Sequence, residues 1–259
     1  MTAPTLSVVI PAYNVAAWLP QTFEHLAAAV RESPWRDVEV VVVDDGSTDD
    51  TAAVAEGLAA VLPVTVVRQA QQGRLLARRA GIEGARGEYV LLLDSRVFID
   101  PGSLRFAAEG MDRIPEARVW NGHVEVATGG NPYASFWKTV AHLGWYHYFR
   151  QPRLVMYGQK DFDRYPKGTG CFLAPRDRLL DAYRQFSTFY DDLRHANDDT
   201  SLIFEIAGRT PITVSPGFSC TYIARGSMVP FVRHAFHRGI VFVDGHFHRG
   251  RRFFWPLVG

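Results

Sequence analysis

The chain has 259 residues, of which 47% are hydrophobic and 13% aromatic, so it can bury a large core as one domain or two closely joined lobes. Its formal net charge of +1 argues against the basic field that draws proteins onto nucleic acid, and we expect no nucleic-acid partner. A signal peptide and an apolar run of about eighteen residues are both lacking, which predicts a cytoplasmic protein, with the cytoplasmic face of a membrane as the alternative. Cys171 and Cys220 have no metal-ligand spacing and are expected to be buried free thiols.

Short β-branched runs alternate with helical patterns through residues 1–100. The patterns predict strands at 5–10, 38–44, 64–68 and 88–94 and helices at 19–30, 54–61 and 76–83, with Thr48 or Asp49 as the cap of the second helix. Strands that are apolar on both faces fit a parallel sheet covered on both sides, which predicts a nucleotide-binding half. Ligands of such sheets bind beyond the carboxyl ends of the strands.

The alternation breaks down over residues 101–229, which we expect to be a substrate-facing half. The patterns here predict a helix near 102–113, a strand at 118–127, a long aromatic segment at 133–165, and a helix at 198–209 that stops at Gly208. Residues 230–259 form a third segment in which histidine and arginine alternate with aromatic residues.

Several sequence blocks occur in a recognisable order and spacing. They are "SVVIPAYN", "VVVDDGSTDDT" and "QQGRLLARRAGIEGARGEYVLLLD", followed more weakly by "GTGCFLAPRDRLL" and "NDDTSLIFEIAG". Together they resemble the family 2 glycosyltransferases of the GT-A fold, continuously over about the first hundred residues. The resemblance implies a doubly wound, mostly parallel nucleotide-binding sheet flanked by helices, with a mixed acceptor-side half. It also implies inverting transfer of a sugar from a nucleoside-diphosphate sugar, with UDP as the first candidate, to a hydroxyl of a glycan or lipid-linked acceptor.

The resemblance assigns a donor-binding role to residues of three loops. Those implied to hold the nucleotide are Pro11, Ala12, Tyr13, Asn14, Asp44, Asp45, Gly73 and Arg78. Two structural alternatives remain open. The Asp-Asp-Gly-Ser stretch is also an ordinary turn and helix cap, and Arg78 and Arg79 also suit a solvated helix face.

The end of the predicted fourth strand departs from the family pattern. Members usually carry Asp-x-Asp there, and the last carboxylate ligates a divalent metal on the diphosphate, whereas this chain has Asp94, Ser95 and Arg96. By their position these three residues are also implied to bind the donor. Three interpretations stay open. Asp94 alone holds Mn²⁺ or Mg²⁺, helped by His234 or His237; Arg96 replaces the metal; or Arg96 is a structural partner of Asp94 or Asp100. The first is favoured, because a divalent ion neutralises more of the departing charge than one guanidinium does.

A base is needed to take the proton of the acceptor hydroxyl. The family's base is the Asp of a Glu-Asp pair at a helix start, and Asp198 and Asp199 stand at the matching position. The match implies that Asp199 is the base and Asp198 its neighbour. Two carboxylates at a helix N-terminus are also favourable without any catalysis, which is the structural alternative.

The last segment has two further interpretations. Basic and aromatic residues interleaved over 230–259 suit a peripheral contact with a membrane interface, and a folded cover over the donor site is the alternative. Two other functions remain for the whole chain: a nucleotide-sugar-binding protein without catalysis, and a sugar-phosphate nucleotidyltransferase. The missing carboxylate leaves room for the first, and the lack of a glycine-rich basic loop after the first strand argues against the second.

Overall fold

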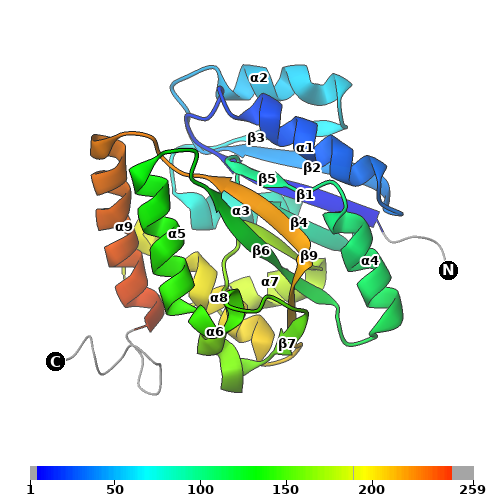
Figure 1. The fold of residues 1–259 in the computed structure, drawn as a ribbon. Helices are drawn as coiled ribbons and strands as arrows, with labels where there is room; N and C mark the ends of the chain where they lie inside the picture. Colours follow the sequence, from blue (N-terminus) through cyan, green and yellow to red (C-terminus); the bar gives the residue numbers. More distant parts are fainter. Residues whose placement is uncertain (1–4, 189, 247–259) are drawn as a thin grey trace.

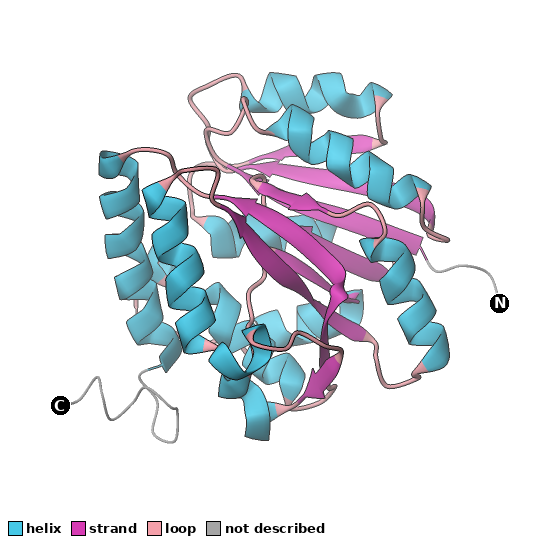
Figure 2. Cartoon of the chain, in the orientation of Figure 1, coloured by secondary structure: helices cyan, strands magenta, loops and turns pink. Residues whose placement is uncertain are grey.

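A mixed sheet runs through the computed structural model, which describes residues 5–188 and 190–246 (Figures 1 and 2). Its strands are β1 (Thr5–Ala12), β2 (Arg36–Asp44), β3 (Val64–Arg68), β4 (Tyr89–Leu93), β5 (Val97–Ile99), β6 (Val119–Ala127), β7 (Val155–Tyr157), β8 (Cys171–Pro175) and β9 (Ile212–Ile223). The strand order is β3-β2-β1-β4-β8-β6-β9-β5, and β7 pairs with β9.

Helices connect these strands and cover the sheet (Figure 2). They are α1 (Leu19–Arg31), α2 (Thr51–Gly57), α3 (Arg74–Gly84), α4 (Ser103–Arg113), α5 (Pro132–Gly144), α6 (Tyr146–Phe149), α7 (Arg176–Arg184), α8 (Asp198–Ala207) and α9 (Met228–His246). Short 3₁₀ turns follow at η1 (Leu58–Ala60), η2 (Gln159–Arg164) and η3 (Leu193–His195). The predicted aromatic segment at 133–165 therefore contains α5, α6, β7 and η2.

The four strands predicted for the first half are confirmed as a parallel unit. β1 pairs in parallel with β2 and β4, and β2 pairs in parallel with β3. Alternate residues of β1 face opposite sides: Val8 lies in one core with α1, α2 and α4, and Val9 lies in the other with α3, α7 and α8. This explains why the strands are apolar at successive positions, since both sheet faces are covered.

α3 approaches the sheet closely because its sequence contains a glycine where it crosses β1. A Cβ added at Gly81 would lie 2.4 Å from a methyl carbon of Val9. The close approach brings the polar first turns of α3 to the carboxyl edge of the parallel strands.

The second half is mixed, as expected. β8 runs antiparallel to β4 and β6, whereas β6 and β9 are parallel. β9 contains an irregularity, because Gly122 pairs with Ser215 and the next residue, His123, pairs with Ser219. Two short strands pair antiparallel with β9, β7 near its start and β5 near its end. The sheet is continuous through both halves.

Two local expectations need correction or limits. α2 begins at Thr51 with Asp50 as its N-cap residue, not Thr48 or Asp49, although an Asp49 oxygen accepts a hydrogen bond from the Thr51 amide at 3.0 Å. The third segment, predicted at 230–259, falls on α9 up to residue 246, and its remainder lies outside the described residues.

Cys171 and Cys220 are both free and buried, which confirms the expectation for them. A hydrogen bond with the Cys171 thiol, together with burial, raises the pKa of Cys220. In the part of the chain that the structure describes, no helix has the length and apolarity needed to cross a membrane.

Candidate active site

The loops after β1 and β2 are tied together by polar side chains. Asn14, at a φ of 52°, accepts a hydrogen bond from the Thr48 amide at 2.8 Å, and its own amide donates to the Ser47 hydroxyl at 3.0 Å. Pro11 and Ala12 end β1, and Tyr13 beyond them is 43% exposed. The first loop is therefore held in place while the Tyr13 ring stays open to solvent.

Asp44 and Asp45 are both buried, but their carboxylates bind different loops. One Asp44 oxygen accepts from the Ser47 amide at 3.0 Å, which tightens its own turn. Asp45 reaches the loop before α3: one of its oxygens accepts from the Gln72 amide and the other from the Gly73 amide, each at 2.8 Å. Asp45 thus positions that loop with both carboxylate oxygens.

Gly73 is the N-cap residue of α3, and its backbone permits no other residue without strain. Its φ is 93°, and a Cβ placed there would lie 3.0 Å from the Cα of Arg194. The turn at Gly73 sets the direction in which α3 starts, and so the direction of Arg74 and Arg78 on its first two turns.

Arg78 joins two carboxylates that come from distant elements. Its side chain is fully buried; one guanidinium nitrogen lies 2.6 Å from Asp94 Oδ1 and the other lies 3.4 Å from Asp199 Oδ1. Asp94 follows β4, where its amide donates to the Gly170 carbonyl at 2.9 Å. The solvated-face alternative is therefore wrong for Arg78. It does describe Arg79, which is half exposed and pairs with Glu83 at 2.9 Å.

Asp199 lies in the first turn of α8 and is contacted from three directions. Besides Arg78, the Arg74 guanidinium lies 3.6 Å from its Oδ2. The Thr169 amide donates to Oδ1 at 3.0 Å, and the Thr169 hydroxyl donates to the same oxygen. α8 itself is capped by Asn197, whose side chain accepts from the Thr200 amide at 2.7 Å. The side chain of Asp198, the expected neighbour of the base, lies outside the described residues.

These contacts change the acidity of Asp199. Burial raises the pKa of its carboxyl, but the guanidiniums of Arg74 and Arg78 and the hydrogen bonds from Thr169 outweigh burial and hold the pKa well below its usual range. The carboxylate is therefore ionised at every pH at which the protein is expected to work. As long as both arginines stay paired with it, it is a weak base.

Ser95 and Arg96 turn away from the strand tip. Ser95 is buried, and its carbonyl accepts from the Thr22 hydroxyl at 2.8 Å. The Arg96 guanidinium donates to the carbonyls of Ile223 and Ala224, each at 3.1 Å, and lies 4.3 Å from the centre of the Trp18 ring. Arg96 is thus structural in this state, but its partners are backbone carbonyls at the end of β9.

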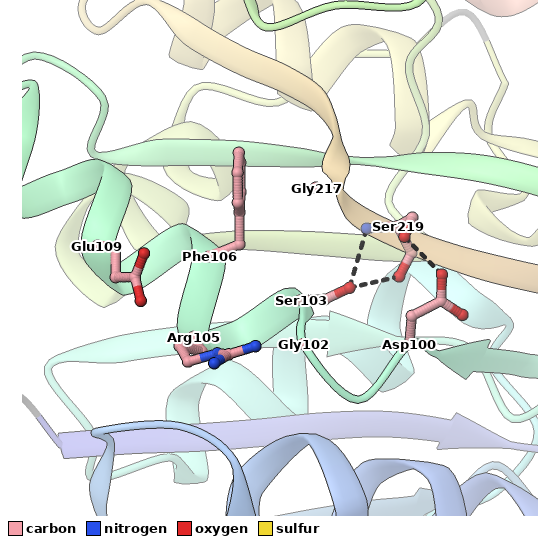
Figure 3. Close-up of a pocket in the computed structure, with 8 residues that line it drawn as sticks. All are labelled: Asp100, Gly102, Ser103, Arg105, Phe106, Glu109, Gly217 and Ser219. Atoms are coloured by element: carbon pink, nitrogen blue, oxygen red, sulfur yellow. Dashed lines mark hydrogen bonds between the residues drawn. The ribbon is translucent and has the colours of Figure 1, made fainter.

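Asp100, one of the two carboxylates expected to pair with Arg96, has another partner. It accepts a hydrogen bond from the Ser219 hydroxyl, at the rim of a hollow of about 400 Å³ between α4 and β9 (Figure 3). The Ser103 hydroxyl donates to the Ser219 carbonyl at 2.8 Å in the same place. These contacts hold the start of α4 against β9.

The residues present do not fit the expected metal site. Within the described residues, no group of three or more His, Cys, Asp or Glu side chains is arranged to hold a metal, so Asp94, His234 and His237 do not form such a group. His234 packs against the Trp137 ring, with 5.8 Å between ring centres. Burial lowers the pKa of His234 to about 3, and Arg238 and two further arginines lower it too. A position surrounded by cations, and a carboxylate already paired with Arg78, both disfavour a divalent ion.

Sequence reasoning missed two side chains of this site, Arg74 and Thr169. Arg74 lies one helical turn before Arg78, a spacing that places both on one face of α3. Thr169 belongs to the Gly-Thr-Gly stretch before β8, which the sequence blocks already contained. Arg238, on α9, lies 4.6 Å from the Trp137 ring centre; burial lowers its pKa, and Asp199 and Asp94 oppose that effect. The basic pattern of 230–259 already offers Arg238 as a candidate to bind phosphate.

Comparison with known proteins gives a family. The profile of "Glycosyl transferase family 2" matches residues 7–179. The chain is 32% identical over 119 residues to "Putative glycosyltransferase EpsH" of Bacillus subtilis (strain 168), a match that covers 44% of this chain and 33% of that protein. It is 36% identical over 120 residues to "Undecaprenyl-phosphate 4-deoxy-4-formamido-L-arabinose transferase" of Pseudomonas paraeruginosa (strain DSM 24068 / PA7), a match that covers 44% of this chain and 35% of that one. These matches span about a third of the length of the curated relatives.

Solved structures show the same fold. S. aureus TarS (residues 1–349) in complex with UDP-GlcNAc aligns with a TM-score of 0.63 at 19% identity, over 98% of this chain and 76% of that 1–349 chain. Mannosyltransferase PcManGT from Pyrobaculum calidifontis, in complex with GDP-Man and Mn²⁺, aligns with a TM-score of 0.63 at 18% identity, over 94% of this chain and 63% of that one. The chain therefore belongs to glycosyl transferase family 2 and has the GT-A fold.

Proposed function

We propose that the protein transfers a sugar from a nucleoside-diphosphate sugar, with a UDP-sugar as the first candidate, to a hydroxyl of a glycan or lipid-linked acceptor, inverting the anomeric centre. The observation that carries the proposal is the meeting of Arg78, Asp94 and Asp199 at the carboxyl edge of the parallel strands. Three elements far apart in the sequence supply these groups, in the region where sheets of this type bind ligands.

The nucleotide would lie over the ends of β1 and β2. The exposed ring of Tyr13 is available to a base, and Asp44 is the strand-end carboxylate for a base N–H or a ribose hydroxyl. Asp45 and Gly73 act as positioning residues, because both Asp45 oxygens accept hydrogen bonds from the loop that ends at Gly73. UDP is the first candidate because the Asp44 and Asp45 block resembles the family's usual uridine pocket. Of two structural neighbours, TarS has UDP-GlcNAc bound and PcManGT has GDP-Man bound, so both nucleotides enter the test below.

The diphosphate would meet arginines rather than a metal. Arg74 and Arg78 already face the carboxylates at the strand edge, and Arg238 lies within electrostatic reach of them. Guanidiniums bind phosphate oxygens in a bidentate way and keep their charge at every working pH. This replaces the metal that the sequence favoured, and it uses Arg74 and Arg78 in place of Arg96, which is bonded to backbone carbonyls.

Asp199 is proposed as the general base. The acceptor hydroxyl gives its proton to the Asp199 carboxylate, its oxygen bonds to the anomeric carbon, and the bond from that carbon to the diphosphate breaks with its electron pair leaving on the phosphate. Asp199 paired with two arginines is a weak base, but an arriving diphosphate competes for the same guanidiniums. Loss of these pairs raises the Asp199 pKa, so donor binding itself would prepare the base.

The name of one relative supports a proposal for the acceptor and its location. One relative is named as an undecaprenyl-phosphate sugar transferase, which supports a lipid-linked acceptor and work at the cytoplasmic face of a membrane.

A thermal-shift panel tests the donor proposal. UDP should raise the melting temperature more than GDP, CDP or dTDP, because selective binding to the native state stabilises it by mass action. The UDP shift should be the same with Mn²⁺ and with EDTA if arginines hold the diphosphate. A larger shift with GDP overturns the choice of nucleotide, and a UDP shift that appears only with Mn²⁺ overturns the arginine assignment.

A further inference from the structure

Exposed apolar side chains gather on two neighbouring helices, α5 and α9. Among the described residues, eleven large hydrophobic side chains are exposed, and eight of them lie on α5, α6 and α9. They are Phe136, Val140, Leu143, Tyr146, Met228, Val229, Val232 and Phe236, which we call the α5–α9 surface. Leu143 is 70% exposed and Phe236 is 73% exposed. An apolar group of this size on one part of a protein marks an interaction site.

The spacing of these residues gives each helix one apolar stripe. Phe136, Val140 and Leu143 follow each other at intervals of four and three residues on α5, and Val229, Val232 and Phe236 at three and four on α9. Residues at such spacing share one face of a helix, so each stripe is a continuous outward face.

Other faces of the same helices hold them together. The Phe231 ring of α9 lies 4.8 Å from Tyr133, 5.5 Å from Phe136 and 6.0 Å from Trp137 of α5, measured between ring centres. His234 also packs on Trp137. The two helices stand side by side at one end of the molecule (Figure 1). The Phe136 ring contacts Phe231 of α9 and is still 49% exposed, so the α5–α9 surface extends to the contact between the two helices.

The charged side chains that α5, α6 and most of α9 themselves carry are cationic, and Lys138 of α5 pairs with Glu125 of β6 at 3.2 Å. The sequence contains no Asp or Glu from Thr128 to Lys160, and none from Ile206 to Val243. These two stretches include all of α5 and α6 and nearly all of α9. The arginines near the exposed stripes are themselves exposed: Arg150, Arg153, Arg225 and Arg233. Apolar stripes framed by cations complement a layer of anionic headgroups over acyl chains.

We propose that the α5–α9 surface docks the protein on an anionic phospholipid membrane. A second copy of the chain suits the surface less well, since a two-fold contact would set the same cationic surface against itself. α9 also carries Arg238, which lies over the Trp137 ring of α5 and within electrostatic reach of Asp199, so docking sets the candidate site beside the lipid. This last step rests on the proposed function, and it favours an acceptor anchored in the membrane over one free in solution.

Vesicle sedimentation with the full chain tests the surface. Vesicles of phosphatidylglycerol and phosphatidylcholine should bind the protein, and vesicles of phosphatidylcholine alone should bind it less. The double variant Val140→Gln with Phe236→Gln should weaken binding about tenfold or more, because two apolar side chains no longer enter the bilayer. Val61→Gln is the matched control, since Val61 is 48% exposed but lies far from α5 and α9 in the sequence, and it should bind like the wild type.

Two charge-reversal variants complete the design. Arg233→Glu should weaken binding to the anionic vesicles, and Arg36→Glu, at the opposite end of β2 from the site, should not. Unchanged binding of the double variant overturns the proposal. So does a lack of binding by the wild type, and so does a wild-type dimer that the double variant converts to monomer. The UDP thermal shift of each variant is measured in parallel. If vesicle binding depends on the α5–α9 surface but UDP causes no thermal shift, the docking proposal is supported and the donor proposal is refuted.

Discussion

Replacing Arg78 with methionine probes the centre of the candidate site. Methionine keeps much of the length and volume of the arginine stem, so the change removes the guanidinium with little loss of packing. It leaves the Asp94 and Asp199 carboxylates without a cation that lies 2.6 Å from one and 3.4 Å from the other.

The size of the effect follows from exposure. Removing one partner of a buried ion pair costs about 3–5 kcal/mol, since the remaining charge stays in a medium that solvates it poorly. Here Arg78 is fully buried, but the Asp94 and Asp199 side chains are 27% and 32% exposed, and water screens part of the loss. We therefore expect the free energy of unfolding to fall by about 2–3 kcal/mol.

Urea unfolding of Arg78→Met and Arg79→Met makes the comparison. Arg79 and its partner Glu83 are both about half exposed, so Arg79→Met should cost only about 0.3–0.5 kcal/mol. The folded Asp199 pKa is depressed, so the stability from its pairing is present at neutral pH and is lost as pH falls through the folded pKa. In Arg78→Met the pairing of Asp199 contributes less, so the difference from wild type should shrink as pH falls from about 4, the unfolded pKa of Asp, toward the folded Asp199 pKa. A cost equal to that of Arg79→Met, or one that grows in acid, would refute the ion-pair account.

Three further predictions concern single positions. Asp199→Asn should retain the UDP thermal shift, and its rate of sugar transfer should fall by about a hundredfold or more, measured as release of UDP in the presence of acceptor. An inactive Asp198→Asn variant beside an active Asp199→Asn variant would assign the base to Asp198. Arg96→Lys should unfold about 1–2 kcal/mol more easily in urea, because two carbonyls lose their donor, while it keeps the UDP shift; a lost shift with unchanged stability would place Arg96 on the diphosphate. Gly81→Ala should lower the free energy of unfolding by about 1–3 kcal/mol, because the added methyl group overlaps Val9. Gly84→Ala, where a Cβ meets nothing within 4 Å, should be neutral or slightly stabilising. Equal effects of the two substitutions would contradict the close approach of α3 to the sheet.

Much of the fold was accessible from local pattern. β1, β2, β3 and β4 were predicted because strand-forming runs and helical spacing are properties of neighbouring residues, and the rule that ligands bind at carboxyl ends followed from their order. The family resemblance then pointed to Asp94 and Asp199, each of which lies at the strand edge. The exact helix starts were less accessible, because a cap depends on loop geometry, as the hydrogen bond from the Thr51 amide to Asp49 shows.

Tertiary structure decided which groups meet. Arg78 pairs with carboxylates 16 and 121 residues away, and Arg96 bonds to a carbonyl 127 residues away, so no local pattern distinguishes the buried cation from the exposed one at Arg79. The sequence by itself determined the parallel first half through periodicity, and its short motifs, through the family resemblance, pointed to the candidate base. Only the packing of α3, α8 and β9 around the strand edge determined that Asp94 faces a guanidinium, because burial and charge balance are set by elements that the chain brings together over long distances.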